Sequence, residues 1–322
     1  MLSESRRSTG PIELGPPDAL GRARRPVFRV TLSAAAACAA ALAGVARLVR
    51  HLAFADLRTL GAPLSWLVGS VLRVRRAHVE AAMRRAGLAD PAGTASRMYG
   101  SLGALVSELL WLAAAGPEDV ATVATLDPSS TELLDEALRA GRGAVLAASH
   151  TGNWELAAMA MARRARLSVL VKPVSLGVLD RFMKDMRKRL GVGLLEGSGA
   201  LLDARGELRR GGVVALLLDQ VPPTAEHAEW LPFLGADALT HRAAAALAAS
   251  VGAPLLVTAS RRGEDGRQVL HVLSVKWPTE GGAGWARRAT REATEELDAF
   301  VRQYPDQWLW MHRRWRGPLG GA

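Results

Sequence analysis

After Gly141 the hydrophobic pattern alternates between short apolar runs and longer stretches with apolar residues at helical spacing. Short apolar runs are typical of buried strands, and apolar residues at every third or fourth position are typical of helices packed on one face. The pattern predicts strands at 144–148, 167–171, 192–195, 213–218 and 254–260, and helices at 156–165, 179–190, 200–210 and 242–251. Such alternation requires crossover connections, so it indicates an α/β fold with a mostly parallel central sheet flanked by helices.

The N-terminal part of the chain has a different pattern. Residues 1–28 lack periodicity and are rich in Ser, Pro, Gly and Arg, so we expect a disordered basic tail. Residues 30–46 are an uncharged run between Arg29 and Arg47, at the lower limit of length for crossing a bilayer. We assign 29–50 to an N-terminal membrane-associated helix, either an anchor or a membrane-docked helix. The alternative is a buried soluble helix, because alanine contributes little to insertion.

A basic helical stretch follows at 52–88, in which arginines are interleaved with apolar residues. It could lie on an anionic membrane surface, or it could be the solvated basic face of an ordinary amphipathic helix. Residues 101–115 predict another apolar helix, whose only charge is Glu108. The sequence suggests no function for Glu108.

Candidate chemistry lies at the end of the first apolar run, in the block HTGNWE at 150–155. A neutral imidazole at His150 can take a proton from a hydroxyl, and a carboxylate on its other nitrogen would fix the tautomer. On a continuous helix, residues five apart lie roughly 140° around the axis, so His150 and Glu155 could meet only if the chain turns at Gly152 and Asn153. The pairing indicates acyl transfer to a hydroxyl. The alternative is a capping or packing histidine followed by an acid in the first helical turn.

Asp219 and Gln220 directly follow the predicted strand 213–218. In an open parallel sheet, ligands gather beyond the carboxyl ends of the strands, so this pair should lie at the same edge as His150. The two side chains could hydrogen-bond an acceptor hydroxyl or brace the loop that follows.

Four motifs together give the chain a wider resemblance. They are the block 150–155, the pair Asp219-Gln220, PFLG at 232–235 with Thr240 downstream, and YPDQWLWMHRRW at 304–315. In their order and spacing, residues from about 60 to 316 resemble the lipid A biosynthesis late acyltransferases, the lauroyl/myristoyl acyltransferases of bacterial inner membranes. The resemblance implies a glycerolipid-acyltransferase-like fold, with an acyltransferase domain at 51–316 and a short tail at 317–322.

The resemblance also implies roles for particular residues. The family's His-x4-Asp/Glu catalytic pair maps onto His150 and Glu155. A functional arginine is implied after this block, for which Arg187 is the closest match and Arg189 is the alternative. Candidate substrate-binding residues are Arg187, Asn153, Asp219 and Gln220.

The implied reaction is direct transfer of a fatty acyl chain from an acyl thioester to a hydroxyl of a lipid A precursor or related glycolipid. The donor would be acyl carrier protein or acyl coenzyme A. Related folds acylate lysophospholipids or phosphatidylinositol mannosides, and a non-catalytic membrane lipid-binding protein is a further alternative. We expect the protein at the cytoplasmic face of the bacterial inner membrane, and we expect no cofactor.

Two segments rich in aromatic residues, 221–239 and 308–315, are candidates for contact with lipid. We expect 221–239 to be a long loop whose Trp230 and Phe233 cover an acyl chain, lie on the membrane or pack in the core. Trp308, Trp310 and Trp315 are interleaved with arginines, a mixture that suits a membrane interface or core positions on a final strand.

The net charge of +10 predicts attraction to anionic partners such as anionic lipid, an acidic carrier protein or nucleic acid. Nucleic acid is disfavoured because no zinc-ligand set, RNP-like sequence or recognition-helix motif accompanies the charge. A basic cluster at 181–189 with Lys172 could recognise phosphate or be a solvated helix face. The single cysteine excludes an intrachain disulfide framework, and no G-x-S-x-G elbow, Walker A loop or metal-ligand spacing is present.

Overall fold

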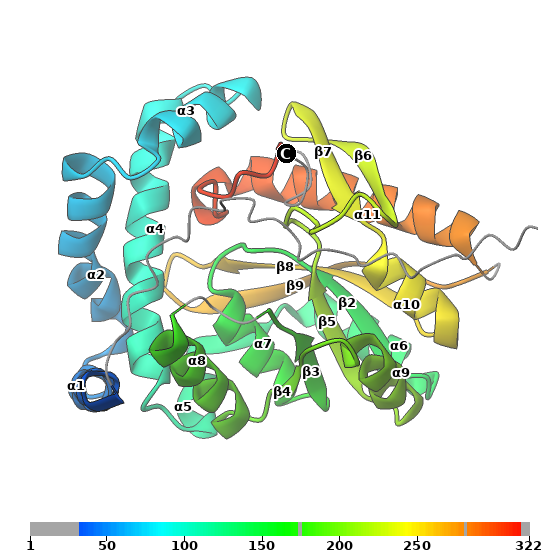
Figure 1. Cartoon of the computed structure of the whole chain (residues 1–322), viewed down its shortest axis with the longest axis horizontal. Helices are drawn as coiled ribbons and strands as arrows, with labels where there is room; N and C mark the ends of the chain where they lie inside the picture. The colour runs from blue at the N-terminus through cyan, green and yellow to red at the C-terminus, as the bar shows by residue number, and fades with distance from the viewer. Residues whose placement is uncertain (1–31, 173–175, 280–281, 317–322) are drawn as a thin grey trace, which may run out of the picture.

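The computed structural model of the chain describes residues 32–172, 176–279 and 282–316. The expected tail at 1–28 and the short tail at 317–322 lie outside these residues. The centre is a seven-stranded sheet with the strand order β1-β9-β8-β2-β5-β3-β4 (Figure 1). Neighbouring strands are parallel except for β8 and β9, so the predicted α/β fold with a mostly parallel sheet is confirmed.

The strands of this sheet are β1 (Ala124–Leu126), β2 (Ala144–Ala148), β3 (Leu167–Leu170), β4 (Gly193–Leu195), β5 (Val213–Leu217), β8 (Leu255–Arg262) and β9 (Gln268–Lys276). The helices are α1 (Leu32–Val49), α2 (Leu57–Trp66), α3 (Arg76–Arg85), α4 (Pro91–Leu112), α5 (Pro117–Val123), α6 (Pro128–Arg139), α7 (Trp154–Ala162), α8 (Gly177–Arg189), α9 (Ala200–Arg209), α10 (Ala243–Val251) and α11 (Ala283–Gln303). A π-helical turn at Leu67–Val71 follows α2.

Helices cover both faces of the sheet, and the alternation of side chains along β2 shows how. Ala144 and Leu146 belong to the core shared with α5, α6 and α7, whereas Val145 and Ala147 belong to the core shared with α9, α10 and α11. A strand buried on both faces must be apolar throughout, which explains the continuous run AVLAA.

The segment 221–239 is not the simple loop that the sequence pattern predicts. It contains β6 (Ala228–Phe233), which pairs with β7 (Ala236–His241) in an antiparallel hairpin. Phe233 is buried in the core and Trp230 is 52% exposed. The alternation was hidden because Trp230 and Pro232, on the outward face, are as apolar as the buried residues between them.

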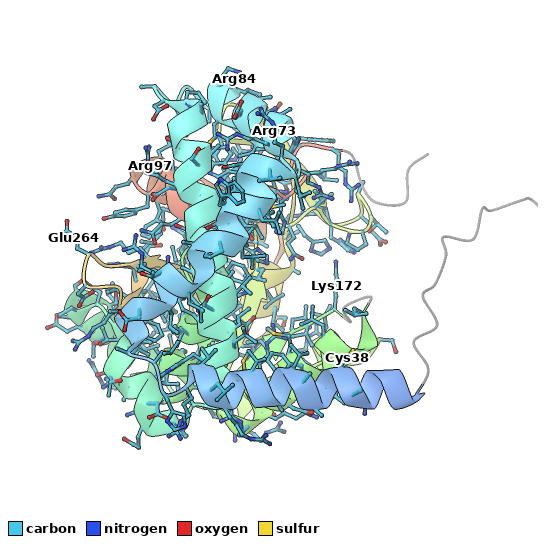
Figure 2. All side chains as sticks on the ribbon, turned by 90° about the vertical axis from the view of Figure 1, so that its left-hand side faces the viewer. Cys38, Arg73, Arg84, Arg97, Lys172 and Glu264 are labelled. Carbon is cyan, nitrogen blue, oxygen red and sulfur yellow. The ribbon has the colours of Figure 1, made fainter. Side chains whose placement is uncertain are left out.

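The N-terminal helices form a separate layer at one end of the sheet. In Figure 1 α1 is seen end-on, and in Figure 2 it projects beyond the rest of the protein. None of the helices in the described part of the chain is long and apolar enough to cross a membrane. Large apolar side chains are exposed on the segment 45–74, among them Trp66 at 64% and Leu72 at 61%.

The C-terminal tryptophans are largely core residues. Trp308 and Trp310 are 1% and 0% exposed, which confirms the core alternative for these two side chains. They do not lie on a strand; the segment instead forms one isolated bridge, between Thr151 and Trp308. The last tryptophan, Trp315, is partly buried and donates its indole N–H to the Phe233 carbonyl at 2.9 Å.

Candidate active site

His150 and Asp219 lie side by side because they follow neighbouring parallel strands. The register pairs Ala148 of β2 with Leu217 of β5, and each candidate residue comes two positions later. His150 Nδ1 is 2.8 Å from Asp219 Oδ1, and the His150 backbone N–H donates to Asp219 Oδ2 at 2.7 Å. The expected gathering of polar residues at this sheet edge is therefore observed.

Asp219 is almost fully buried and has a third donor. The indole N–H of Trp308 donates to its Oδ2 at 2.8 Å. Burial alone would raise the pKa of Asp219, but the charge of the His150 imidazole and the hydrogen bonds outweigh burial and hold that pKa well below its usual range. Asp219 is thus a permanent carboxylate at neutral pH.

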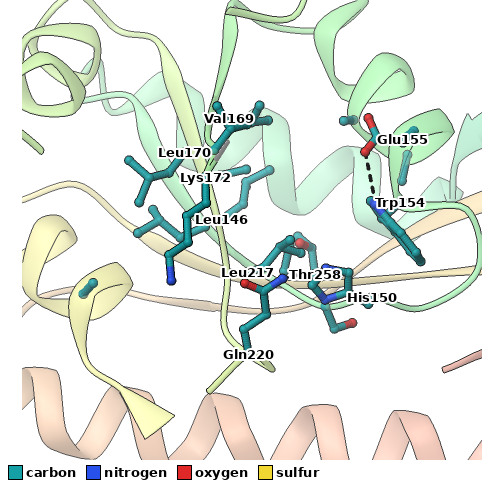
Figure 3. Close-up of a pocket in the computed structure, with 18 of the residues that line it drawn as sticks. Leu146, His150, Trp154, Glu155, Val169, Leu170, Lys172, Leu217, Gln220 and Thr258 are labelled. Carbon is teal, nitrogen blue, oxygen red and sulfur yellow. Dashed lines mark hydrogen bonds between the residues drawn. The ribbon is translucent and has the colours of Figure 1, made fainter. Parts of the chain in front are cut away.

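The other ring nitrogen of His150 faces Gln220. His150 Nε2 is 3.1 Å from the side-chain amide nitrogen of Gln220. With an ionised Asp219 on Nδ1, the hydrogen bonds assign the proton to Nδ1, which leaves Nε2 as an acceptor for the Gln220 amide. Figure 3 shows Gln220 beside His150, with Glu155 farther away, next to Trp154. The basic lone pair of His150 is thereby directed away from the core.

Glu155 has a different partner from the one expected. It accepts two hydrogen bonds from Arg187, from Nε at 2.8 Å and from Nη2 at 2.5 Å, and a third from the Trp154 indole at 3.1 Å. Both ring nitrogens of His150 are engaged by Asp219 and Gln220, so the structure does not bring His150 and Glu155 together as the sequence pattern suggested. The reason is that α7 begins at Trp154, which turns Glu155 toward α8.

Of the two candidate arginines, Arg187 reaches the site. Burial would lower its pKa, but the hydrogen bonds and charge of Glu155 raise it, so the guanidinium remains charged. Arg189 points elsewhere, donating to the carbonyls of Ala115 and Leu112.

Asn153 caps the helix that begins beside the site. Its Oδ1 accepts the backbone N–H groups of Glu155 and Leu156 at 3.1 and 3.0 Å, so it is the N-cap of α7. Its amide donates to Glu108 at 2.8 Å, and Glu108 is in turn paired with Arg262 at 2.7 Å. The side chain of Asn153, a candidate for substrate binding, is thus buried and hydrogen-bonded to α7 and to Glu108.

Gly152 makes the turn between His150 and α7. Its φ is +55°, and a Cβ there would lie 2.8 Å from the Ser260 carbonyl oxygen. A side chain at this position would therefore be both strained and obstructed.

A cavity of about 530 Å³ opens beside His150 (Figure 3). Its polar lining includes His150, Gln220, Arg187 and Lys172. The remainder is mostly apolar and runs between the sheet and α7, lined among others by Leu146, Ala157, Met161, Val169 and Leu217. A largely apolar space with a histidine in its lining suits a fatty acyl chain whose reactive carbon lies beside that histidine.

Two further residues at the site were not predicted. Trp308 was considered only as an interface or core residue, and His312 was not considered. The His312 ring lies 4.7 Å from that of His150, measured between centroids. Burial, and repulsion from His150 when that ring is protonated, lower the pKa of His312 to about 4, so its ring is uncharged at neutral pH. The dense aromatic motif at 304–315 was the only signal in the sequence for either residue.

Comparison with known families identifies the chain. Residues 28–317 match the model of the family described as bacterial lipid A biosynthesis acyltransferase. The chain belongs to this family. The resemblance seen in the sequence is thereby confirmed, and acyl transfer to a lipid is the activity that the family indicates. No curated protein matches the chain significantly.

Membership places the His150 cavity in the context of a lipid A acyltransferase. Within the residues that the structure describes, no group of three or more His, Cys, Asp or Glu side chains could hold a metal ion. Among the titratable side chains that line the cavity, His150 is the one that is hydrogen-bonded to a buried carboxylate, that of Asp219.

Proposed function

We propose that this acyltransferase moves a fatty acyl chain from an acyl thioester to a hydroxyl of a lipid A precursor or related glycolipid, with His150 as general base. The observation that carries the proposal is the hydrogen bond from His150 Nδ1 to the buried carboxylate of Asp219, at the mouth of an apolar cavity. In this proposal Asp219, rather than Glu155, orients the base.

The proton transfer follows from this geometry. The acceptor hydroxyl takes the place of the Gln220 amide at His150 Nε2 and gives its proton to that nitrogen. The hydroxyl oxygen then attacks the thioester carbonyl carbon, and the C–S bond breaks as the tetrahedral intermediate collapses. The imidazolium returns its proton to the leaving thiolate. Asp219 stabilises the imidazolium while it exists.

Arg187 supplies fixed positive charge to the lining of the cavity. Glu155 holds its guanidinium through two hydrogen bonds, so little reorganisation is needed when negative charge develops nearby. We propose that this charge attracts either the thioester oxygen or a phosphate of a substrate. The first backbone N–H groups of α7 are less suited to that role, because Asn153 already caps them.

We also propose that the protein works at an anionic membrane surface, on the cytoplasmic face of the bacterial inner membrane. The support is the exposed apolar surface at 45–74, which carries Trp66 and Leu72 together with Arg73. Contiguous apolar exposure with basic neighbours is typical of surfaces that contact lipid. The donor proposed is acyl carrier protein, with acyl coenzyme A as the alternative.

The test is an acyl-transfer assay with detergent-solubilised protein, a radiolabelled acyl carrier protein thioester and total membrane lipids of the source cell. Wild type should give a labelled lipid, which mass spectrometry would identify as a glycolipid or a phospholipid. His150→Ala should give none while remaining folded, and Arg97→Ala, at an exposed position on α4, is the control. If neither this donor nor acyl coenzyme A gives label with wild type, the proposal is wrong and lipid binding without turnover becomes the better interpretation.

A further inference from the structure

A second, smaller cavity is lined largely by arginines. It has a volume of about 390 Å³ and is formed by Ala228, Glu229, Arg242, Arg287, Arg288 and Arg291. These residues come from the start of β6, the turn before α10 and the first half of α11. We call it the arginine pocket. Four of its six lining side chains are positively charged and one is negatively charged, so its net charge is strongly positive.

The arginine pocket adjoins the acyl cavity through one turn of the chain. His241 and Ala243 line the acyl cavity, and Arg242 between them lines the arginine pocket. This turn joins β7 to α10 (Figure 1). A substrate large enough to extend around this turn could have its reactive part at His150 and an anionic group among the arginines.

Two features of these charges are unfavourable for the helices that carry them. Arg291 lies three and four residues after Arg288 and Arg287 on α11, and like charges at these spacings destabilise a helix. Arg242 is the N-cap of α10, where the helix dipole favours an anion over a cation. Both features would become favourable if an anion occupied the pocket.

Glu229 holds two of the arginines in place without neutralising the pocket. Its Oε1 is 3.2 Å from Arg287 Nε and 3.6 Å from Arg242 Nη1. Arg242 also donates to the His227 carbonyl at 3.3 Å, and its side chain is only 15% exposed. Arg287 is 63% exposed, so a ligand can reach it from solvent. The next acid along α11, Glu292, is engaged by Lys276 at 3.0 Å.

We propose that the arginine pocket is a phosphate-binding subsite, which holds a phosphate group of one substrate during acyl transfer. The inference rests on the proposed function, because it takes the bound molecule to be a substrate of the His150 site. Guanidinium groups bind phosphate through paired N–H donors, and several in one concave site favour a phosphate monoester over a carboxylate of lower charge. The phosphate could belong to the headgroup of the acceptor glycolipid or to the nucleotide of an acyl coenzyme A donor.

The first experiment measures binding alone, by titration calorimetry of the full-length protein in detergent. The probes are glucosamine 1-phosphate for the lipid headgroup and adenosine 3′,5′-bisphosphate for the nucleotide. The pocket variant is Arg287→Gln/Arg291→Gln, and the matched control is Arg84→Gln/Arg97→Gln, which removes the same charge from exposed sites on α3 and α4 (Figure 2). At least one probe should bind wild type and the control equally, and should bind the pocket variant at least tenfold more weakly. Equal binding by all three proteins, or no binding by wild type, would overturn the proposal.

The second experiment identifies the source of the phosphate from steady-state kinetics. The pocket variant should show a KM at least tenfold higher for the acceptor lipid or for the donor, and the substrate affected carries the phosphate. If probe binding is lost but neither KM changes, the pocket holds an adventitious ion only and the substrate role is overturned. If wild type transfers no acyl group while probe binding is still lost in the pocket variant, the proposed function fails and the phosphate site stands.

Discussion

The first and last residues of the block 150–155 each pair with an oppositely charged or polar partner, and the two pairs differ in their chemistry. His150 pairs with Asp219 across neighbouring strands, and Glu155 pairs with Arg187 across α7 and α8. All four side chains are less than a fifth exposed. The first pair can exchange a proton, because imidazole titrates near neutral pH, whereas an arginine pair stays ionised. A short linear motif can thus contribute one residue to each of two separate pairs. The fold determines the partner residue in each pair.

The largest effect should come from removing the carboxylate of the first pair. Asp219→Asn should lower kcat by about 10³-fold, because the new amide can donate to Nδ1 and force the proton onto Nε2, where it blocks base catalysis. The radiolabelled acyl-transfer assay measures this change in kcat, and Asp203→Asn on the exposed face of α9 is the control. If Asp219→Asn were active and Glu155→Gln inactive, Glu155 and not Asp219 would be the residue that orients His150.

Breaking the second pair should lower stability in addition to any effect on acyl transfer. Glu155→Gln and Arg187→Gln should each lower the free energy of unfolding by roughly 3 kcal/mol, because each leaves a largely buried charge without its partner. The double variant should lose less than the sum of the two. Chemical denaturation of all four proteins measures the coupling. A coupling energy near zero would mean that the pair is not formed in solution.

A smaller effect is expected in the pH dependence of stability. The pKa of His312 is about 4 in the folded protein and about 6.5 in the unfolded chain, so the unfolded chain binds the proton more tightly. Stability should therefore fall by roughly 2 kcal/mol as the pH drops from about 6.5 toward 4. The groups that act on this ring are His150, Asp219, Arg75 and Arg314.

Replacement of this histidine tests that dependence directly. His312→Asn should remove this part of the acid destabilisation, whereas His51→Asn at an exposed position should retain it. Denaturation midpoints measured between pH 7 and 4 would show the difference. Parallel pH profiles for wild type and His312→Asn would contradict the assignment.

The smallest effect should come from the third donor to Asp219. Trp308→Phe removes one hydrogen bond to the carboxylate and should lower kcat about tenfold, which corresponds to 1.4 kcal/mol. Trp310→Phe is the matched control, since its indole N–H donates to the Pro305 carbonyl instead. Equal losses in both variants would show that packing, and not the bond to Asp219, is responsible.

The sequence predicted the strands with long apolar runs and missed those without. The runs at 144–148 and 213–218 were found because strands buried on both faces must be continuously apolar. β1 has only three residues, Ala124–Leu126, too few for a periodic signal. β9 does alternate, as QVLHVLSVK, and this signal was present but not used. The hairpin at 228–241 was hidden by apolar residues on its exposed face.

The sequence predicted which residues belong to the site, but not which of these residues pair with one another. His150, Glu155, Arg187, Asp219 and Gln220 were all identified as candidates, and all five line the cavity or contact a residue that does. Their partners depend on β2 and β5 being neighbours, and on α8 packing beside α7. Neither fact can be obtained from spacing along the chain, because β3 and β4 lie between β2 and β5 in sequence.

Residues 307–309, which contact the site, are synthesised late. Gln307 accepts the Gly152 N–H at 2.8 Å, Leu309 donates to the His150 carbonyl at 3.1 Å, and Trp308 reaches Asp219. The ribosome makes His150 and Asp219 long before these residues. A chain that ends before residue 304 would lack all three of these contacts around the base. The complete site can therefore assemble only after nearly all of this sequence has been synthesised.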